Sequence, residues 1–282
     1  MMIYREDNLI GYDDTHTEQF FSGSDHIREY ENNLKKQPND WIYKKKKFSY
    51  KRNAHGHRTP KDVKDLRKDF FLFTGCSHTE GIGIAHDETY AHIVSDSFNI
   101  DYYNIALGGT GADVMYHNLV HWFKNNYPKP KLVFLQWPDP TRYSCIDDTN
   151  NRIIDAIYKN NKFKSVTAYG MWNFNDEQID EILNHGDSIT SPAPDYFKVA
   201  RREIKALLNK YNVNFLEYFM YGQSPGPFGW PKTRLASVNL DIRHDVRTVT
   251  MIDKGRDFLH AGPKTNEIFA HRLIAKIKKI GW

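Results

Sequence analysis

The chain has 282 residues, of which 40% are hydrophobic and 14% aromatic, and its formal net charge is +4. This length suits one large domain, or a domain with a smaller appendage, and the apolar content is enough for a substantial core. No apolar run approaches the roughly 18 residues that span a bilayer, and the N-terminus lacks the basic start and apolar stretch of a secretory signal. The sequence therefore predicts a cytoplasmic protein without membrane contact. Its 2 cysteines are too few for a disulfide framework.

Residues 1–66 are polar, charged and weakly periodic, and no long amphipathic helix stands out among them. We expect them to form an N-terminal extension to a main domain of residues 67–282, packed on that domain or in assembly contacts with a partner. The basic run from Lys44 to Lys47 lies among aromatic residues, a combination that can bind nucleic acid or an acidic polysaccharide. It carries no recognition-helix pattern and no metal knuckle. We therefore expect solvated lysines and no nucleic-acid partner.

From Asp69 onward, short apolar runs alternate with helix-like stretches, which is typical of a parallel sheet with crossover helices. The predicted strands are residues 70–73, 101–106, 131–136, 213–217 and 246–252. The predicted helices are residues 88–98, 108–125, 195–211 and 264–280, and the last two carry apolar residues at helical spacing. Between them, residues 147–194 are irregular and rich in Asn, Asp and aromatics, so we expect helices and long loops that form a wall of the substrate site.

A serine follows the first predicted strand at the point where the apolar run breaks into glycines. Ser77 comes directly after Gly75 and Cys76, and far downstream Asp257 precedes His260 by three residues. In a turn or helix this spacing places the carboxylate and the imidazole on the same side. The aspartate can then orient the histidine, and the histidine can take the proton of an attacking serine. These three residues are the predicted catalytic group, and activity is expected to rise as His260 loses its proton.

Ligands of an open parallel sheet bind outside the carboxyl ends of its strands, where the segments after the first three predicted strands all lie. The backbone N–H groups of Ser77 and Gly109 are the predicted donors to the oxyanion of a tetrahedral intermediate. A glycine suits position 109, because the backbone there must approach the substrate closely.

Three blocks of the sequence resemble the SGNH (GDSL-type) hydrolase family. Gly75-Cys76-Ser77, with Thr79 and Gly81 after it, stands where that family carries Gly-Asp-Ser, and Cys76 replaces the usual aspartate. Asn104–Gly109 resembles the second block, and Asp257-Phe258-Leu259-His260 resembles the Asp-x-x-His block. The resemblance covers roughly residues 67–282. It implies a three-layer α/β/α, flavodoxin-like fold with a mainly five-stranded parallel sheet, and ester hydrolysis without a metal or organic cofactor.

By this match Ser77 is the nucleophile, His260 the base, Asp257 its partner and Gly109 an oxyanion donor. The family's third block supplies an asparagine to the oxyanion hole, whereas this chain has none there, so Gln136 or Arg142 is the candidate replacement. The expected substrate is an ester-bearing small molecule or an acetylated polysaccharide. The residues expected to line its site are Trp137, Tyr143, Trp172 and Trp230.

Gly108–Gly111 at a helix start could cradle a phosphate, but no lysine follows at phosphate-loop spacing. His55 with His57 could bind a metal, but no third ligand lies near them in sequence. His117 and His121 share a helix face, but the Glu of a zincin motif is missing, so no metal is expected. An α/β-hydrolase elbow needs glycine where Thr79 stands. The alternative function is a catalytically weak or inactive binding protein of the same fold, such as a virion component encoded by a phage.

Overall fold

The structure is a computed structural model, and it describes residues 2–5, 9–138, 142–147, 163–169, 193–218 and 251–281. A parallel four-stranded sheet forms its centre, in the order β10-β7-β5-β6. These strands are β5 (Phe70–Thr74), β6 (Asp101–Asn104), β7 (Leu132–Gln136) and β10 (Phe215–Tyr218). They confirm four of the predicted strands. The fifth, at 246–252, lies mostly outside the described residues, and its last two residues are not in a strand.

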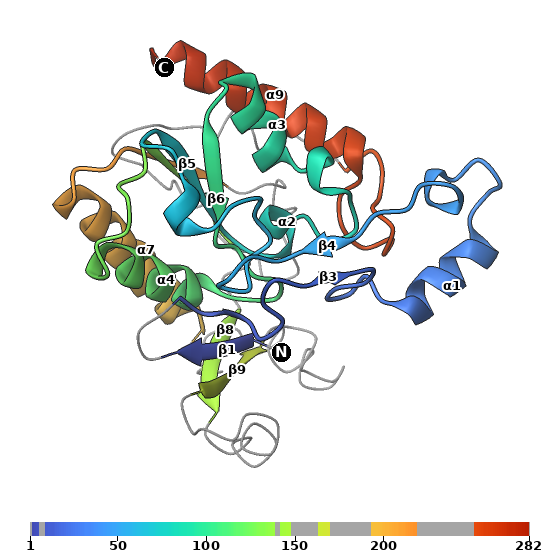
Figure 1. Cartoon of the computed structure of the whole chain (residues 1–282), viewed down its shortest axis with the longest axis horizontal. Helices are drawn as coiled ribbons and strands as arrows, with labels where there is room; N and C mark the ends of the chain where they lie inside the picture. Colours follow the sequence, from blue (N-terminus) through green and yellow to red (C-terminus); the bar gives the residue numbers. More distant parts are fainter. Residues whose placement is uncertain are drawn as a thin grey trace, which may run out of the picture.

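Helices cover both faces of this sheet, which makes the fold a three-layer α/β/α arrangement (Figure 1). Four helices lie close to the predicted positions: α3 (Tyr90–Ser97), α4 (Ala112–Lys124), α7 (Ala193–Lys210) and α9 (Pro263–Lys279). Within the described part of the chain, no helix is both long and apolar enough to cross a membrane.

The alternation of side chains along β5 builds the two halves of the core. Phe70 and Leu72 pack with α4 and α7 on one face, whereas Phe71 and Phe73 pack with α3 and α9 on the other. Successive side chains of a strand point to opposite faces of its sheet. Because both faces are covered by helices, β5 is apolar at every one of these positions and fully buried.

A second, antiparallel sheet lies beside the first and joins distant parts of the chain (Figure 1). Its strands, in order, are β2 (Gly11–Tyr12), β1 (Met2–Arg5), β9 (Phe163–Tyr169) and β8 (Tyr143–Asp147). The expectation of helices and loops across residues 147–194 is therefore wrong for β9. This segment is extended because it pairs with β8 on one side and with β1 on the other, and sequence periodicity does not register such long-range pairing.

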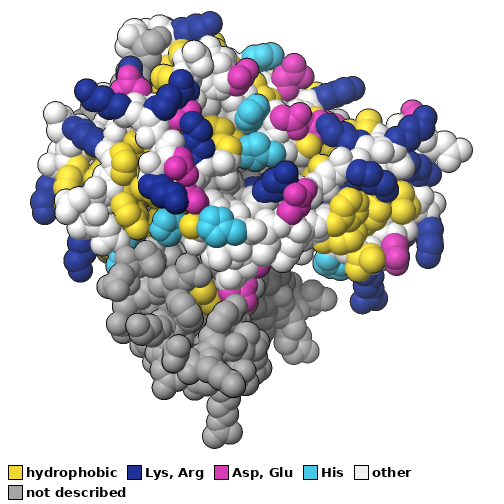
Figure 2. Space-filling view, in the orientation of Figure 1, with side chains coloured by type: hydrophobic (Ala, Val, Ile, Leu, Met, Phe, Trp, Pro, Cys, Tyr) yellow, Lys and Arg dark blue, Asp and Glu magenta, His cyan; other side chains and the backbone are white. Residues whose placement is uncertain are grey.

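Residues 20–48 form an arm that projects from the sheet core, with α1 (Ile27–Lys36) and the short 3-10 helix η1 (Ile42–Lys44) (Figure 1). The strands β3 (Glu18–Gln19) and β4 (Tyr50–Lys51) pair at its base, and the 3-10 helix η2 (Val63–Asp65) follows. The sequence analysis missed α1, which buries only Tyr30 and Asn33. Hydrophobic surface gathers on this side of the molecule (Figure 2), and the exposed large apolar side chains of the arm are Phe20, Ile27 and Ile42.

Candidate active site

Ser77 lies at the carboxyl edge of the parallel sheet, where β5 ends and the one-turn helix α2 (Ser77–Glu80) begins. The backbone carbonyl of Cys76 accepts hydrogen bonds from the N–H groups of Thr79 and Glu80, at 3.0 Å each, and closes this turn. A Cβ at Gly75 would lie 2.4 Å from the Thr79 hydroxyl oxygen, so only glycine fits there. The turn therefore fixes the backbone of Ser77, whose side chain keeps 7% exposure.

Asp257 and His260 lie in a closed loop that leads into α9. The carboxylate of Asp253 caps the helix by accepting hydrogen bonds from the N–H groups of Lys264 (2.9 Å) and Thr265 (2.8 Å). Across the loop, the N–H of Gly255 donates to the carbonyl of His260 at 2.8 Å. The Oδ1 atom of Asp257 accepts the N–H of His260 at 3.1 Å, which holds the two residues in one tight turn.

The three predicted catalytic side chains form one continuous hydrogen-bonded chain. The Ser77 Oγ lies 2.7 Å from the Nε2 of His260, and the Nδ1 of His260 lies 2.5 Å from the Oδ2 of Asp257. Burial raises the pKa of Asp257, but the hydrogen bonds and charge of His260, together with the Ser24 hydroxyl, outweigh burial and lower it to about 2. Asp257 is therefore a carboxylate at neutral pH and can stabilise a protonated His260.

The loop that carries Gly109 is held against Ser77 by the buried carboxylate of Glu80. The N–H of Gly108 donates to the Oε2 of Glu80 at 2.6 Å, and the hydroxyl of Tyr12 donates to the same oxygen at 3.1 Å. A Cβ at Gly108 would lie 3.6 Å from the Cβ of Ser77, which shows how closely the two loops approach. Gly109 follows with a φ of +79°, a conformation that favours glycine.

Burial raises the pKa of Glu80, against the lowering effects of Arg52, Arg58, the Tyr12 hydroxyl and the Gly108 N–H. Three of these groups, Tyr12, Arg52 and Arg58, come from the N-terminal segment. The loop that carries Gly109, the second predicted oxyanion donor, is thus held in place partly by residues outside the range that the family resemblance covers.

Gln136 lies beneath the nucleophile turn and supports it. Its Oε1 accepts from the N–H of Cys76 (3.2 Å) and from the hydroxyl of Thr79 (3.1 Å), and its amide nitrogen donates to the Trp137 carbonyl at 2.7 Å. These contacts favour a positioning role. Arg142, the other candidate, lies near enough to the site for its charge to act on His78.

His78 is a site residue that the sequence analysis missed. Its ring lies edge-on to that of His260, with 4.8 Å between centroids. Burial lowers the pKa of His78 well below its ordinary range, and the charges of His260 and Arg142 lower it further. His78 is therefore a neutral imidazole beside the imidazole of His260. Its position directly after the serine is the signal that could have indicated it.

The structure does not bring Trp137 to the surface of the site. Its side chain is 2% exposed, packs edge-on to Phe197 in the core, and donates from Nε1 to Glu217 at 3.0 Å. The expectation that it lines the substrate site is wrong, because Trp137, which directly follows β7, is covered by α7. Tyr143 begins β8, whereas Trp172 and Trp230 lie outside the described residues.

The arm anchors the loop that carries Asp257 and His260. Arg256 and Asp25 are both fully buried and form an ion pair at 2.8 Å, and the hydroxyl of Tyr50 donates to the same carboxylate at 2.5 Å. The guanidinium of Arg256 also stacks on the ring of Phe48, at 3.8 Å from its centroid. The sequence analysis missed this pair. Asp25 and Arg256 are 231 residues apart in the sequence, and neither lies in a local sequence motif.

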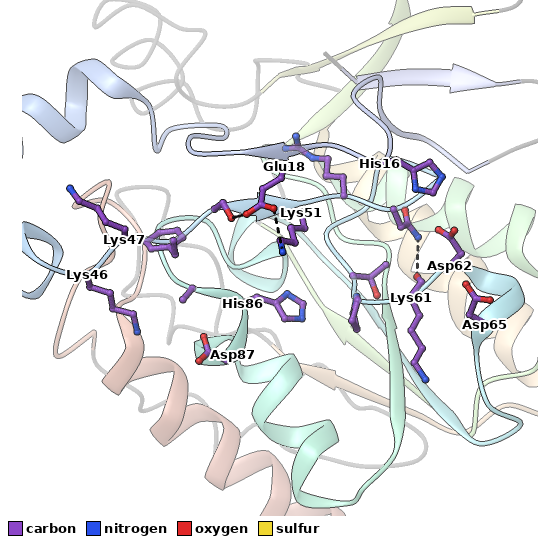
Figure 3. A pocket seen from close by; sticks show the side chains of 17 residues that line it. His16, Glu18, Lys46, Lys47, Lys51, Lys61, Asp62, Asp65, His86 and Asp87 are labelled. Atoms are coloured by element: carbon purple, nitrogen blue, oxygen red, sulfur yellow. Dashed lines mark hydrogen bonds and ion pairs between the residues drawn. The ribbon is translucent and has the colours of Figure 1, made fainter.

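A cleft of about 800 Å³ lies between the N-terminal segment and the turn of His86, and neither Ser77 nor His260 lines it (Figure 3). Three of its lysines are paired: Lys51 with Glu18 at 3.3 Å, Lys46 with Glu88 at 2.5 Å, and Lys61 with Asp101 at 2.8 Å. Among the residues that the structure describes, no group of three or more His, Cys, Asp or Glu side chains could hold a metal ion.

No protein-family model and no curated protein matches this chain. Among solved structures it is similar to the psychrotrophic esterase EstA from Pseudoalteromonas sp., with 12% identity, 75% of this chain and 97% of the esterase covered, and a TM-score of 0.33. It is also similar to a lipolytic protein of the G-D-S-L family from Veillonella parvula, with 13% identity, 75% and 99% coverage, and a TM-score of 0.33.

A third similar structure is the acetyl xylan esterase Est2A from Butyrivibrio proteoclasticus, with 14% identity, 77% of this chain and 66% of the esterase covered, and a TM-score of 0.36. These neighbours are lipolytic and carbohydrate esterases.

Proposed function

We propose that this protein is a serine-dependent ester hydrolase. The observation that carries the proposal is the unbroken hydrogen-bonded chain from the Ser77 hydroxyl through His260 to the buried carboxylate of Asp257. A serine hydroxyl is a weak nucleophile unless an adjacent base takes its proton, and an imidazole is such a base only when its other nitrogen carries the hydrogen. Asp257 accepts that Nδ1–H, so Nε2 is left to accept the proton of Ser77.

The reaction proceeds in two halves. Ser77 Oγ attacks the ester carbonyl as its proton moves to His260 Nε2, and the carbonyl oxygen becomes an oxyanion held by the N–H groups of Ser77 and Gly109. The intermediate collapses, the alcohol leaves with the proton of His260, and an acyl group stays on Ser77. A water molecule then gives a proton to His260 and attacks the acyl group. The bond to Ser77 Oγ breaks, the proton of His260 returns to that oxygen, and the acyl group leaves as a carboxylic acid.

The proposed substrate is the O-acetyl ester of a carbohydrate or a similar carboxylic ester. The motif resemblance supports this class, and the close approach of Gly108 to Ser77 suits a small acyl group. A series of 4-nitrophenyl esters of increasing acyl length, with acetate release from acetylated xylan alongside, tests it. The highest kcat/KM is expected for acetate, and a maximum at a long acyl chain would contradict this substrate class.

Replacing the nucleophile is the direct test of the activity. Ser77→Ala is expected to lower kcat on 4-nitrophenyl acetate by about 1000-fold or more, because the attacking oxygen is removed. Ser97→Ala, an exposed serine on α3, is the matched control and should keep wild-type turnover. Wild-type turnover no greater than that of Ser77→Ala would overturn the enzymatic proposal.

Labelling with a fluorophosphonate separates an active hydrolase from the alternative, a binding protein of the same fold without turnover. Covalent modification at Ser77, located by peptide mass spectrometry, is expected for the wild type and for Ser97→Ala. An absence of labelling from neutral to alkaline pH would support the inactive alternative.

A further inference from the structure

The residues that touch Asp257 include one from the far end of the chain. A tight turn at Ser22–Asp25 is closed by two backbone hydrogen bonds, from the N–H of Ser22 to the Asp25 carbonyl (2.8 Å) and from the N–H of Asp25 to the Ser22 carbonyl (3.1 Å). Gly23 takes a φ of +60° within it. The turn places Ser24 at its tip, with a half-buried side chain.

The Ser24 hydroxyl completes the shell of hydrogen bonds around the carboxylate. It donates to the Oδ2 of Asp257 at 2.7 Å, and the same oxygen lies 2.5 Å from the Nδ1 of His260. The Ser24 Oγ is itself 3.4 Å from that Nδ1. The opposite oxygen, Oδ1, accepts the backbone N–H groups of Leu259 and His260, at 3.1 Å each. Three atoms thus meet within hydrogen-bond range of one another: Ser24 Oγ, Asp257 Oδ2 and His260 Nδ1.

We propose that Ser24 is a positioning residue for the Ser77–His260–Asp257 group, supplied by the N-terminal segment. This inference rests on the proposed function. The hydroxyl fixes the direction in which Oδ2 offers its remaining lone pair, and that direction holds the Nδ1–H tautomer of His260. The imidazole then keeps its Nε2 aimed at Ser77 throughout the reaction. Small losses of such alignment are costly in rate, because the reacting atoms must stay in near-attack geometry.

A second effect of Ser24 is electrostatic. A hydrogen bond to a carboxylate spreads its negative charge and favours the ionised form. Without the hydroxyl, the charge of Asp257 would be concentrated on the oxygen that faces His260, and the proton on the imidazole would be held more tightly. The rate would then reach its plateau only at higher pH.

The turn that carries Ser24 is fixed independently of its hydroxyl. Its neighbour Asp25 is held in the buried ion pair with Arg256 and by the hydroxyl of Tyr50. The backbone of Ser24 therefore stays in place when its side chain is truncated. This makes the serine suitable for a clean substitution.

The test compares Ser24→Ala with Ser24→Thr, which keeps a hydroxyl, and with Ser97→Ala as the control. On 4-nitrophenyl acetate, Ser24→Ala is expected to lower kcat by about 10-fold with little change in KM, and to move the acid limb of the pH–rate profile to higher pH. Ser24→Thr should recover most of the lost kcat and the wild-type profile. Thermal melting of each variant checks that the fold is intact.

Ser24→Ala could show the kcat and the pH profile of the wild type while Ser77→Ala is inactive. This result would overturn the role of Ser24 and leave the proposed function intact. A loss in Ser24→Ala that Ser24→Thr does not recover, with an unshifted pH profile, would also overturn the role of Ser24. Failure of the proposed function looks different, since wild type and Ser77→Ala would then hydrolyse the ester equally slowly.

Discussion

Gly83 shows how closely the loops around the candidate site fit together. Its carbonyl accepts the N–H of Arg256 at 2.6 Å, and its N–H donates to the hydroxyl of Tyr50 at 2.8 Å. A Cβ at this position would lie 2.8 Å from the Oδ1 of Asp257. The φ of Gly83 is +86°, and Gly281 at the end of α9 has the same value with no atom within 4 Å of its would-be Cβ.

Alanine substitutions at Gly83 and Gly281 distinguish the effect of backbone strain from the effect of too little space for a side chain. Gly83→Ala is expected to lower the free energy of unfolding by about 2–4 kcal/mol and to reduce kcat, because the methyl group displaces Asp257. Gly281→Ala should cost about 1 kcal/mol or less, since only the left-handed backbone is penalised. Urea denaturation and turnover of 4-nitrophenyl acetate measure both effects. Equal losses of stability, with turnover kept in both variants, would contradict the packing argument.

At the scale of residues, the three proposed catalytic residues could be predicted from the sequence, but the residue proposed to position them could not. Ser77, Asp257 and His260 each stand in a local pattern, a strand followed by a glycine turn or a three-residue spacing before a helix, and these patterns can be recognised in the sequence. Ser24 stands in a polar segment without such a pattern. Its role comes from a contact with Asp257 that only the folded chain creates.

At the scale of elements, the ion pair between Asp25 and Arg256 joins the arm to the loop before α9. Both side chains are fully buried. Removing one member of a buried pair leaves the other as an uncompensated charge, so Arg256→Met is expected to cost about 3–5 kcal/mol of unfolding free energy. The double variant Asp25→Asn with Arg256→Met should cost less than Arg256→Met alone.

Urea denaturation of this double-mutant cycle measures the coupling of the two residues. Lys51→Met is the control, because the Lys51–Glu18 pair is largely exposed, with 74% and 55% of the side chains accessible, and such pairs contribute about 1 kcal/mol or less. A cost for Arg256→Met no larger than that for Lys51→Met would show that the pair does not anchor the arm.

The elements that the sequence predicted are those with a strong local signal. β5 and β7 are short apolar runs, β6 and β10 carry aromatic residues, and α7 and α9 carry apolar residues at helical spacing. The missed elements include β1, β8 and β9, which are extended through pairing within one antiparallel sheet, and α1, which buries few residues. The placement of Trp137 failed for a related reason, since a tryptophan at a strand end can face either the solvent or a covering helix.

At the scale of the whole molecule, two half-buried neutral histidines, His86 and His117, make stability depend on pH. Burial, with help from the charges of Arg58 and His92, lowers the pKa of His86 from 6.5 to about 4. Burial and His121 lower the pKa of His117 to about 4 as well. These two histidines therefore bind more protons in the unfolded chain than in the folded one between pH 6.5 and 4. Their contribution to stability is fully present above pH 6.5 and is lost as the pH falls toward 4.

The contribution of His86 can be isolated by substitution. Between pH 7.5 and 4.5, His86→Gln should reduce the loss of unfolding free energy seen in the wild type by about 2 kcal/mol, because glutamine takes up no proton. His271→Gln on the exposed face of α9 is the control and should leave the loss unchanged. Urea denaturation at the two pH values checks this, and an identical pH dependence in wild type and His86→Gln would contradict it.

The order in which the chain is made bears on when its serine becomes reactive. Ser77 and His260 are separated by 183 residues, and Ser24 and Asp257 by 233. A ribosome therefore releases Ser77, the proposed nucleophile, and Ser24, its proposed N-terminal support, long before their partners are synthesised. Until then the hydroxyl of Ser77 has no imidazole beside it and is expected to be as inert as that of any surface serine. Chemical reactivity at Ser77 would thus indicate that residue 260 has been synthesised and that the segment around Asp257 and His260 has folded against Ser24 and Ser77.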